Sequence, residues 1–277
     1  EGLDVTIKPG GPDIAPAQVL AGGGADVMVD WMPSALAARE KGLPLVNIAQ
    51  PFKSSGMMLT CRKDMGVNST DDLKGKTLGV WFYGNEYPFL SWMSRLGLAT
   101  DGSADGVTVL KQGWGVEPLT EGQAACVSTM SYNEYWVVRD AGYSPEQLTV
   151  FKYQTEGAST LEDGLYVLEK NLGDSSFKDK MVRFVRASMK GWKYAEANPK
   201  EAASIILDND DAGVQTEKHQ VRMMGEIAKL TAGSNGALDP ADYQRTVKVL
   251  MSGASDPVIT KEPSGAWTHD ITNAALN

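Results

Sequence analysis

A glycine, an amide and a carboxylate interrupt the aromatic run "WFYGNEY" at residues 81–87. Gly84 allows a ligand to approach the backbone closely, Asn85 can donate and accept hydrogen bonds, and Glu86 can accept paired N–H donors. Trp81 and Tyr83 add flat ring faces beside these polar groups. Stacking combined with a carboxylate hydrogen bond selects planar ligands that carry N–H groups. We therefore predict that this segment forms one wall of a ligand cleft.

The same combination recurs in "TMSYNEY" at residues 129–135, where Tyr132, Asn133 and Glu134 follow an apolar run. A third candidate is "DWMPS" at residues 30–34, which contributes Trp31 and Ser34. An Asn-Glu pair also suits the first turn of a helix without any ligand, because of capping and the helix dipole. This capping alternative stays open, although the adjacent aromatic side chains favour ligand binding.

The residues needed for common catalytic sites are missing from the sequence. The two histidines, His219 and His269, lie in polar surroundings that favour surface or structural roles. There is no Gly-x-Ser-x-Gly motif, no phosphate-binding loop and no spacing typical of a metal site. The run "GGGAD" at residues 22–26 precedes a predicted strand and so is no dinucleotide-binding fingerprint. We therefore predict a protein that is not an enzyme and needs no cofactor.

The net charge of the chain limits the classes of partner that it is expected to bind. Its 277 residues carry a formal net charge of −9, and the isoelectric point is about 4.8. Nucleic acids and anionic membranes attract basic surfaces, so neither is an expected partner. No apolar run reaches the roughly 18 residues that a membrane span needs. The start at Glu1, without methionine or signal peptide, indicates a processed or truncated chain.

Cys61 and Cys126 lie in separate apolar runs, and their spacing matches no metal or redox motif. Two buried free thiols are the favoured interpretation, and one disulfide is the alternative.

Short apolar runs alternate with helical patterns along the chain, which is typical of α/β folds. Polar and aromatic residues follow several of these runs, at the sheet edge where open α/β folds bind ligands. The series occurs twice without a linker, which favours two lobes joined by crossing strands. The predicted strands are residues 3–9, 25–31, 45–50, 57–61, 77–81, 107–112, 124–130 and 148–153, with one more within 156–172. The predicted helices begin near residue 13 and at 33–42, 87–96, 118–123, 133–142, 175–199, 199–207, 216–230 and 240–251.

The chain resembles periplasmic solute-binding proteins of ABC importers, in the branch that binds sulfonate, nitrate and thiamine pyrimidine precursors. That branch is also similar to the thiamine pyrimidine synthases. The matching stretches are "EGLDVTI", "QVLAGGGADVMVDWMPSALAAREKGLPLVNIAQPF", "STDDLKGKTLGVW", "EGQAACVSTMSYNE", and "EDGLYVLEKNL" followed by "FVRASMKGWKYAEANPKEAA". The family usually starts with one further strand and helix, which are absent here. The synthases use a His and a Lys in that segment and a cysteine-rich run later, whereas "YQTEGASTLEDGL" has no cysteine.

The resemblance implies a two-lobed α/β periplasmic binding protein fold (type II), with mostly parallel sheets joined by two crossing strands. Residues 1–55 and 158–277 would form lobe one, and residues 56–157 would form lobe two. The lobes would close on the ligand by a hinge motion near residues 50–57 and 153–164. We expect a monomer, periplasmic or lipid-anchored outside the cytoplasm, that delivers its small-molecule ligand to an ABC permease.

The ligand-contacting loop of the family aligns with "GNEYP", where Glu86 would repel an anion. The expected ligand is therefore a small planar nitrogen heterocycle, neutral or cationic, such as hydroxymethylpyrimidine, formylaminopyrimidine or a flavin. Two alternatives are an anion binder of the same fold, for sulfonate or nitrate, and a thiamine pyrimidine synthase-like enzyme. Trp81 and Tyr83 would stack on the ring, opposite Trp31 or Tyr132. The predicted ligand-binding residues are Trp31, Ser34, Trp81, Tyr83, Gly84, Asn85, Glu86, Tyr132, Asn133 and Glu134.

Overall fold

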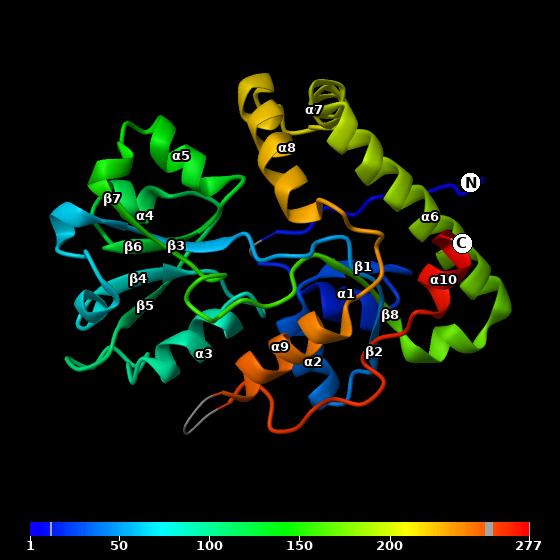
Figure 1. The fold of residues 1–277 in the computed structure, drawn as a ribbon, viewed down its shortest axis with the longest axis horizontal. Helices are drawn as coiled ribbons and strands as arrows, with labels where there is room; N and C mark the ends of the chain where they lie inside the picture. Colours follow the sequence, from blue (N-terminus) through cyan, green and yellow to red (C-terminus); the bar gives the residue numbers. More distant parts are fainter. Residues whose placement is uncertain (12, 253–256, 277) are drawn as a thin grey trace.

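Two β-sheets organise the chain in a computed structural model, which describes residues 1–11, 13–252 and 257–276 (Figure 1). The three-stranded sheet β1-β8-β2 and its helices are called lobe one, and the five-stranded sheet β5-β4-β6-β3-β7 and its helices are called lobe two. The α/β class predicted from the sequence is confirmed, while the exact lobe boundaries stay a prediction. The strands are β1 Met28–Asp30, β2 Leu45–Ala49, β3 Met57–Arg62, β4 Thr77–Val80, β5 Thr108–Lys111, β6 Cys126–Met130, β7 Leu148–Lys152 and β8 Gly164–Leu168.

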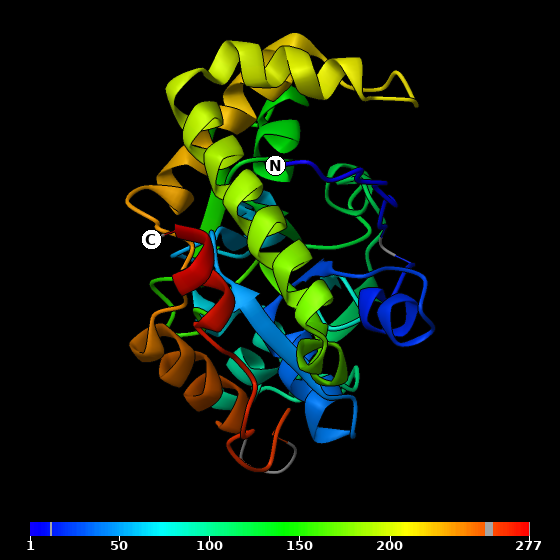
Figure 2. The same ribbon diagram turned by 90° about the vertical axis from the view of Figure 1, so that its right-hand side faces the viewer.

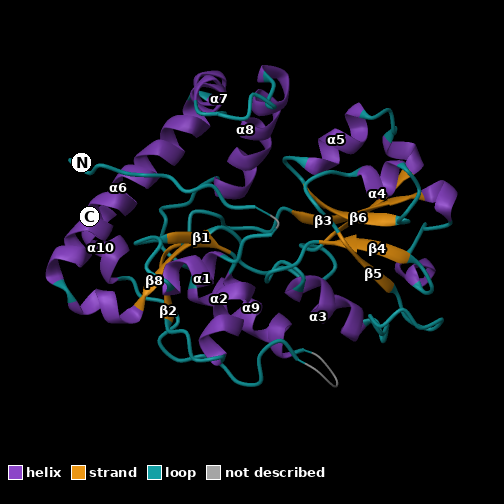
Figure 3. Cartoon of the chain, turned by 180° about the vertical axis from the view of Figure 1, so that it is seen from behind, coloured by secondary structure: helices purple, strands orange, loops and turns teal. Residues whose placement is uncertain are grey.

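Helices cover both faces of the lobe-one sheet, while α3 to α5 surround the lobe-two sheet (Figures 1 and 3). Figure 2 shows the long helix α6 running along lobe one with α10 beside it. The helices are α1 Pro16–Ala21, α2 Met32–Glu40, α3 Tyr87–Arg95, α4 Glu117–Thr120, α5 Glu134–Asp140, α6 Ser175–Ala197, α7 Pro199–Asp208, α8 Glu217–Thr231, α9 Pro240–Met251 and α10 Asp270–Leu276. Short 3-10 helices cover Lys63–Met65, Thr70–Leu73, Pro145–Gln147 and Glu169–Gly173.

The strand directions correct the expectation of mostly parallel sheets. Strand β8 pairs antiparallel with β1 and β2, and β3 pairs antiparallel with β6 and β7. Only β4 forms parallel ladders among the described residues, with β5 and β6. The reason is that β3 and β8 each follow a segment that crosses between the lobes. Each therefore enters its sheet against the direction of the other strands.

Glu162 ties the two crossing segments together. Its carboxylate accepts hydrogen bonds from Ser55 Oγ at 2.5 Å, from the Gly56 amide at 2.8 Å and from the Met57 amide at 3.2 Å. The side chain of Gln50 donates to the backbone carbonyl of Glu162. These contacts lie within the predicted hinge segments 50–57 and 153–164, so the two connections are held as one unit.

Lobe one buries both faces of its sheet because successive strand residues point to opposite sides. Leu45 and Tyr166 pack toward α2 and α9, whereas Val46 and Val167 pack toward α6 and α10. Helix α6 buries one stripe with 3.6-residue periodicity, as predicted. The buried side chains of this stripe are Phe177, Met181, Val185 and Met189.

Three local predictions are wrong. Residues 3–9 form no strand, because they have no neighbouring strand to pair with and Ile7 is 80% exposed. The N-terminal segment is held at its start instead. There the Glu1 carboxylate forms ion pairs with Lys190 Nζ at 2.5 Å and with Arg186 Nη1 at 3.3 Å. The first helix starts at Pro16 rather than near residue 13. The free-thiol interpretation also fails, because Cys61 and Cys126 are register partners on β3 and β6 and form a disulfide.

Candidate ligand-binding site

A cavity of about 140 Å³ lies between the lobes, at the carboxyl end of β1. Its wall is formed by the N-terminal segment, the end of β1, the turn after β4 and the crossing segment before β8. This position at a strand end is where α/β folds commonly bind ligands. The lining residues are Gly11, Ile14, Pro16, Val29, Asp30, Trp31, Tyr83, Asn85 and Asp163.

Trp31, Tyr83 and Asn85 are the predicted site residues that reach this cavity. Trp31 is only 8% exposed and packs with the lobe-two core although it belongs to lobe one. Tyr83 is 45% exposed, and Lys111 Nζ lies 5.1 Å from the centre of its ring. Asn85 Nδ2 donates to the Phe82 carbonyl at 3.2 Å, which leaves its amide oxygen without a hydrogen bond inside the turn.

Gly84 and Ser34 form a direct contact between the lobes. Gly84 has φ 107°, and a Cβ placed there would lie 2.5 Å from the Ser34 Cβ. The close approach predicted for Gly84 is therefore made to the start of α2 in the opposite lobe. Ser34 Oγ donates to Asp30 Oδ2 at 2.9 Å, so Ser34 also orients a cavity carboxylate.

The carboxylates of Glu86 and Glu134 accept hydrogen bonds from backbone amides of the turns in which they lie. Glu86 Oε2 accepts the Gly84 amide at 2.7 Å, and Glu134 Oε2 accepts the Met130 amide at 2.9 Å. Both glutamates thus hold the strand-to-helix turn that precedes their helix, and neither lines the cavity. This geometry supports a structural role close to the capping alternative.

The remaining predicted residues are not among those that line the cavity. Trp81 Nε1 donates to the Gly113 carbonyl at 3.0 Å. Tyr132 lies edge-on to Phe52 with ring centres 6.4 Å apart. Asn133 Oδ1 lies 2.7 Å from Nε2 of His219, which reaches across from α8.

Three acidic residues at the site were not predicted: Asp30, Glu162 and Asp163. Burial raises the pKa of Asp30 to about 7 and that of Glu162 to about 8. Burial likewise raises the pKa of Asp163 to about 6, against a hydrogen bond from the Trp31 side chain that lowers it. The charge of Asp163 contributes to the raised pKa of both neighbouring carboxyls.

A signal for these acids was present in the sequence. Glu162 and Asp163 interrupt the apolar residues of "LEDGLYVL", directly before a fully buried strand. Charged residues in such a position are rarely buried unless they are paired or functional. Asp30 likewise is buried at the end of β1, beside Trp31.

The lobes also meet between α8 and α5. Arg222 Nη1 lies 2.9 Å from Asp140 Oδ2, and its guanidinium lies 4.8 Å from the centre of the Trp136 ring. Together with the contact between His219 and Asn133, these interactions form what we call the α8–α5 clasp. Burial lowers the pKa of His219, which favours the neutral ring in this contact. His269 has the expected structural role, because its Nε2 lies 2.8 Å from the Leu238 carbonyl.

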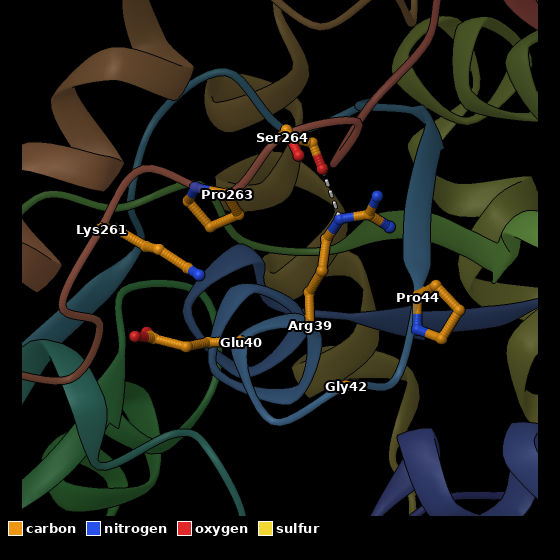
Figure 4. Close-up of a pocket in the computed structure, with 7 residues that line it drawn as sticks. All are labelled: Arg39, Glu40, Gly42, Pro44, Lys261, Pro263 and Ser264. Atoms are coloured by element: carbon orange, nitrogen blue, oxygen red, sulfur yellow. Dashed lines mark hydrogen bonds between the residues drawn. The ribbon is translucent and has the colours of Figure 1, made fainter.

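A wider hollow of about 250 Å³ lies on the outside of lobe one, beside the end of α2 (Figure 4). Arg39 on its wall donates to the Ser264 carbonyl at 2.7 Å, to the Leu45 carbonyl at 3.0 Å and to Glu169 at 2.8 Å. Glu40 accepts the Thr260 amide at 2.9 Å. These side chains already fasten α2 to the loop around it, so we place the ligand in the cavity between the lobes.

Comparison with known proteins gives one family and a consistent fold. A family model described as NMT1/THI5 like matches residues 1–202. The chain is 24% identical to the formylaminopyrimidine-binding protein of Halalkalibacterium halodurans over 277 residues, which cover 97% of this chain and 82% of that protein.

Two solved structures are similar in fold. The periplasmic sulfonate-binding protein SsuA of Methylobacillus flagellatus has a TM-score of 0.64 at 15% identity, covering 94% of this chain and 77% of that one. The desulfurization enzyme DSZB has a TM-score of 0.60 at 14% identity, covering 90% of this chain and 84% of that one. The predicted two-lobed periplasmic binding protein fold is thereby confirmed.

Proposed function

The chain belongs to the NMT1/THI5-like family, and we propose on this basis that it binds a small planar nitrogen heterocycle between its lobes. It would then deliver this ligand to an ABC permease. The observation that carries the proposal is the cavity between the lobes, where Trp31 and Tyr83 supply aromatic walls and Asp30 and Asp163 supply acceptors. Aromatic faces and a few convergent polar groups are what a binding site for a flat, N–H-bearing ring requires.

The size of the cavity favours a single ring. Its volume of about 140 Å³ is small beside the roughly 300–1,000 Å³ of sites for drug-sized ligands. A substituted pyrimidine therefore suits the site better than a flavin. The relative that binds formylaminopyrimidine supports the same class of ligand.

An anionic ligand is disfavoured by the charge of the cavity. Asp30 and Asp163 are both carboxylic acids, and none of the ion pairs among the described residues neutralises either of them. A sulfonate or nitrate would have to lie against these groups in a site of low dielectric. We therefore propose a ligand chemistry different from that of the sulfonate-binding protein of similar fold.

The proposed role is binding and not catalysis. The NMT1/THI5-like family description leaves a synthase-like enzyme as the alternative, and pyridoxal phosphate distinguishes the two. A lysine-bound pyridoxal absorbance on adding the cofactor would favour the enzyme. Extracytoplasmic location and delivery to a permease are part of the proposal. Among the helices of the described residues, none combines the length and apolar character needed to cross a membrane.

Thermal unfolding with added ligands tests the proposed function. We expect 4-amino-5-hydroxymethyl-2-methylpyrimidine to raise the melting temperature, whereas ethanesulfonate and nitrate leave it unchanged. Tyr83→Ala should weaken the pyrimidine about three- to tenfold, because one stacking face is lost. Tyr194→Ala is the matched control, since Tyr194 is similarly exposed (43%) but lies on α6 away from the cavity. Stabilisation by the sulfonate alone would overturn the proposal.

A further inference from the structure

Asp163 holds a carboxylate oxygen in the cavity wall without a partner. Its Oδ2 is buried, and no hydrogen-bond donor in the structure contacts it. Leaving a buried carboxylate oxygen unpaired costs free energy, so such an atom in a cavity points to a ligand group. The backbone of Asp163 has φ 40°, a conformation that is unfavourable for a residue with a side chain. The crossing segment before β8 thus keeps this carboxylate in place at some cost.

The surroundings of Asp163 contain more acid than base. Asp30 lines the same cavity, and its oxygens accept the Trp31 amide at 2.8 Å and Ser34 Oγ at 2.9 Å. Glu162 precedes Asp163 and is bound by the crossing segments. Burial raises the pKa of Tyr132, and the nearby charges of Asp163, Glu162 and Glu134 raise it further.

Among the described residues, no lysine or arginine lines the cavity. Lys111, beside the ring of Tyr83, is paired with Asp13 at 2.7 Å. None of the ion pairs formed by the described residues includes Asp30, Glu162 or Asp163. The cavity therefore holds acidic groups that no cationic side chain of the described residues balances.

We propose that Asp163, with Asp30 beside it, forms an ion pair with a positively charged nitrogen group on the ligand. This inference rests on the proposed function and specifies its ligand as a flat ring that carries an ammonium or a protonated amidine. Trp31 and Tyr83 suit such a ligand, because aromatic faces attract organic cations as well as planar rings. Asp163 is then the residue that separates cationic from neutral ligands of equal size.

The raised pKa values support a proton linkage at this site. Near neutral pH burial keeps a proton on Glu162 and partly on Asp30, whereas Asp163, with a pKa of about 6, is largely ionised. A bound cation favours the ionised form, so binding should release protons. Preference for a cation should accordingly increase from pH 5.5 to pH 7.5.

Two matched pairs of compounds test the inference by calorimetric titration. The first pair is 4-amino-5-aminomethyl-2-methylpyrimidine and its neutral 5-hydroxymethyl counterpart. The second pair, benzylammonium and benzyl alcohol, tests the charge without the pyrimidine ring. We expect at least tenfold tighter binding of the ammonium member, with proton release in buffers of different ionisation enthalpy.

Variants assign the preference to Asp163. Asp163→Asn should abolish the preference for the ammonium, so that the ammonium and hydroxymethyl members of each pair bind with equal affinity. Asp71→Asn is the control for loss of one negative charge, because Asp71 is exposed on lobe two and should keep the preference intact. A preference that survives Asp163→Asn would overturn the inference, as would equal binding of both members of each pair.

The outcomes also separate this inference from the proposed function. Binding of the neutral pyrimidine without any preference for cations would keep the proposed function and overturn the ion pair. Asp163-dependent binding of benzylammonium, with no binding of either pyrimidine, would keep the ion pair and overturn the proposed function. Stabilisation by Ca²⁺ or Mg²⁺ alone, lost in Asp163→Asn, would overturn the organic cation in favour of a metal ion.

Discussion

Tyr83 and Asp163 are the two non-glycine residues with positive φ among those that the structure describes, at 63° and 40°. Both line the cavity between the lobes. Unfavourable backbone conformations of this kind persist where surrounding structure imposes them, and they gather at functional sites. Their coincidence at one cavity links the turn after β4 to the crossing segment before β8, although the two are far apart in sequence.

The buried carboxyls predict how stability depends on pH. In an unfolded chain Asp and Glu ionise near pH 4, whereas the folded protein keeps protons on Asp163 to about pH 6, on Asp30 to about 7 and on Glu162 to about 8. Between pH 4 and 8 the folded state therefore binds more protons than the unfolded state. The free energy of unfolding must fall as pH rises across this range.

We expect the ligand-free protein to lose at least about 2 kcal/mol of unfolding free energy between pH 5 and pH 8, measured by urea titration. His219 acts in the opposite direction below about pH 6.5, since its pKa is lowered in the fold. His219→Gln should therefore steepen the fall, and Glu162→Gln should flatten it. Stability that stays constant over this range would contradict the assigned burial of the three carboxyls.

At the scale of elements, the sequence predicted which segments are strands and helices more reliably than how they pair. Hydrophobic periodicity depends on local burial, so α2, α6 and β3 were found close to their observed bounds. Strand direction and register depend on distant partners, so neither the antiparallel ladders of β3 and β8 nor the Cys61–Cys126 pair could be read from spacing. The prediction of a strand at residues 3–9 was wrong for the same reason. An alternating pattern forms a strand only where an adjacent strand can pair with it.

The site was only partly predictable for a related physical reason. Trp31, Tyr83 and Asn85 were predicted because aromatic and amide groups at strand ends suggest stacking and hydrogen bonding, and all three line the candidate cavity. Asp163 was not predicted, because its proposed role depends on the cavity opposite, which forms only when both lobes are in place. Sequence shows that a carboxylate is present, but not that one of its oxygens lacks a partner.

The turn before α3 fits against the start of α2 only because residue 84 is glycine. Gly84→Ala should strain the backbone, because alanine is unfavourable at the φ of 107° that residue 84 adopts. The substitution also places a Cβ 2.5 Å from the Cβ of Ser34. Gly142→Ala is a matched control, with φ 103° and open space around the added Cβ. The strain common to both is about 1–3 kcal/mol, and the contact between lobes adds to it for Gly84 alone.

We expect thermal unfolding to show the larger loss for Gly84→Ala, and X-ray scattering to show a more open molecule. Equal losses in the two variants, with unchanged scattering, would mean that α2 and the turn do not touch in solution.

At the scale of the whole molecule, the structure has its lobes closed. Gly84 lies against Ser34 on one side of the cavity, while the α8–α5 clasp joins the lobes on another. The proposed hinge opening would break these contacts, so they would contribute free energy to the closed state alone. A binding protein of this kind tunes its affinity through such contacts, because a ligand that needs the closed state binds in proportion to its population.

Removing the α8–α5 clasp should therefore weaken ligand binding from a distance. In the double variant Arg222→Ala/His219→Ala, the closed state loses the ion pair with Asp140 and the contact with Asn133. Together these two interactions contribute about 1 kcal/mol to the closed state. We expect a larger radius of gyration by X-ray scattering without ligand, and an affinity about three- to tenfold lower. Saturating ligand should restore the compact form, since binding draws the population back to the closed state.

Lys229→Ala supplies the control on the same helix, because Lys229 pairs with Glu226 within α8 at 2.7 Å and not across the lobes. Its scattering profile and affinity should match those of the unaltered protein. If the double variant also matched it, the clasp would contribute nothing to closure, and the closed state would depend on the cavity and the Gly84–Ser34 contact. Since the clasp lies outside the cavity wall, a lowered affinity in the double variant would instead show that closure and binding are energetically coupled.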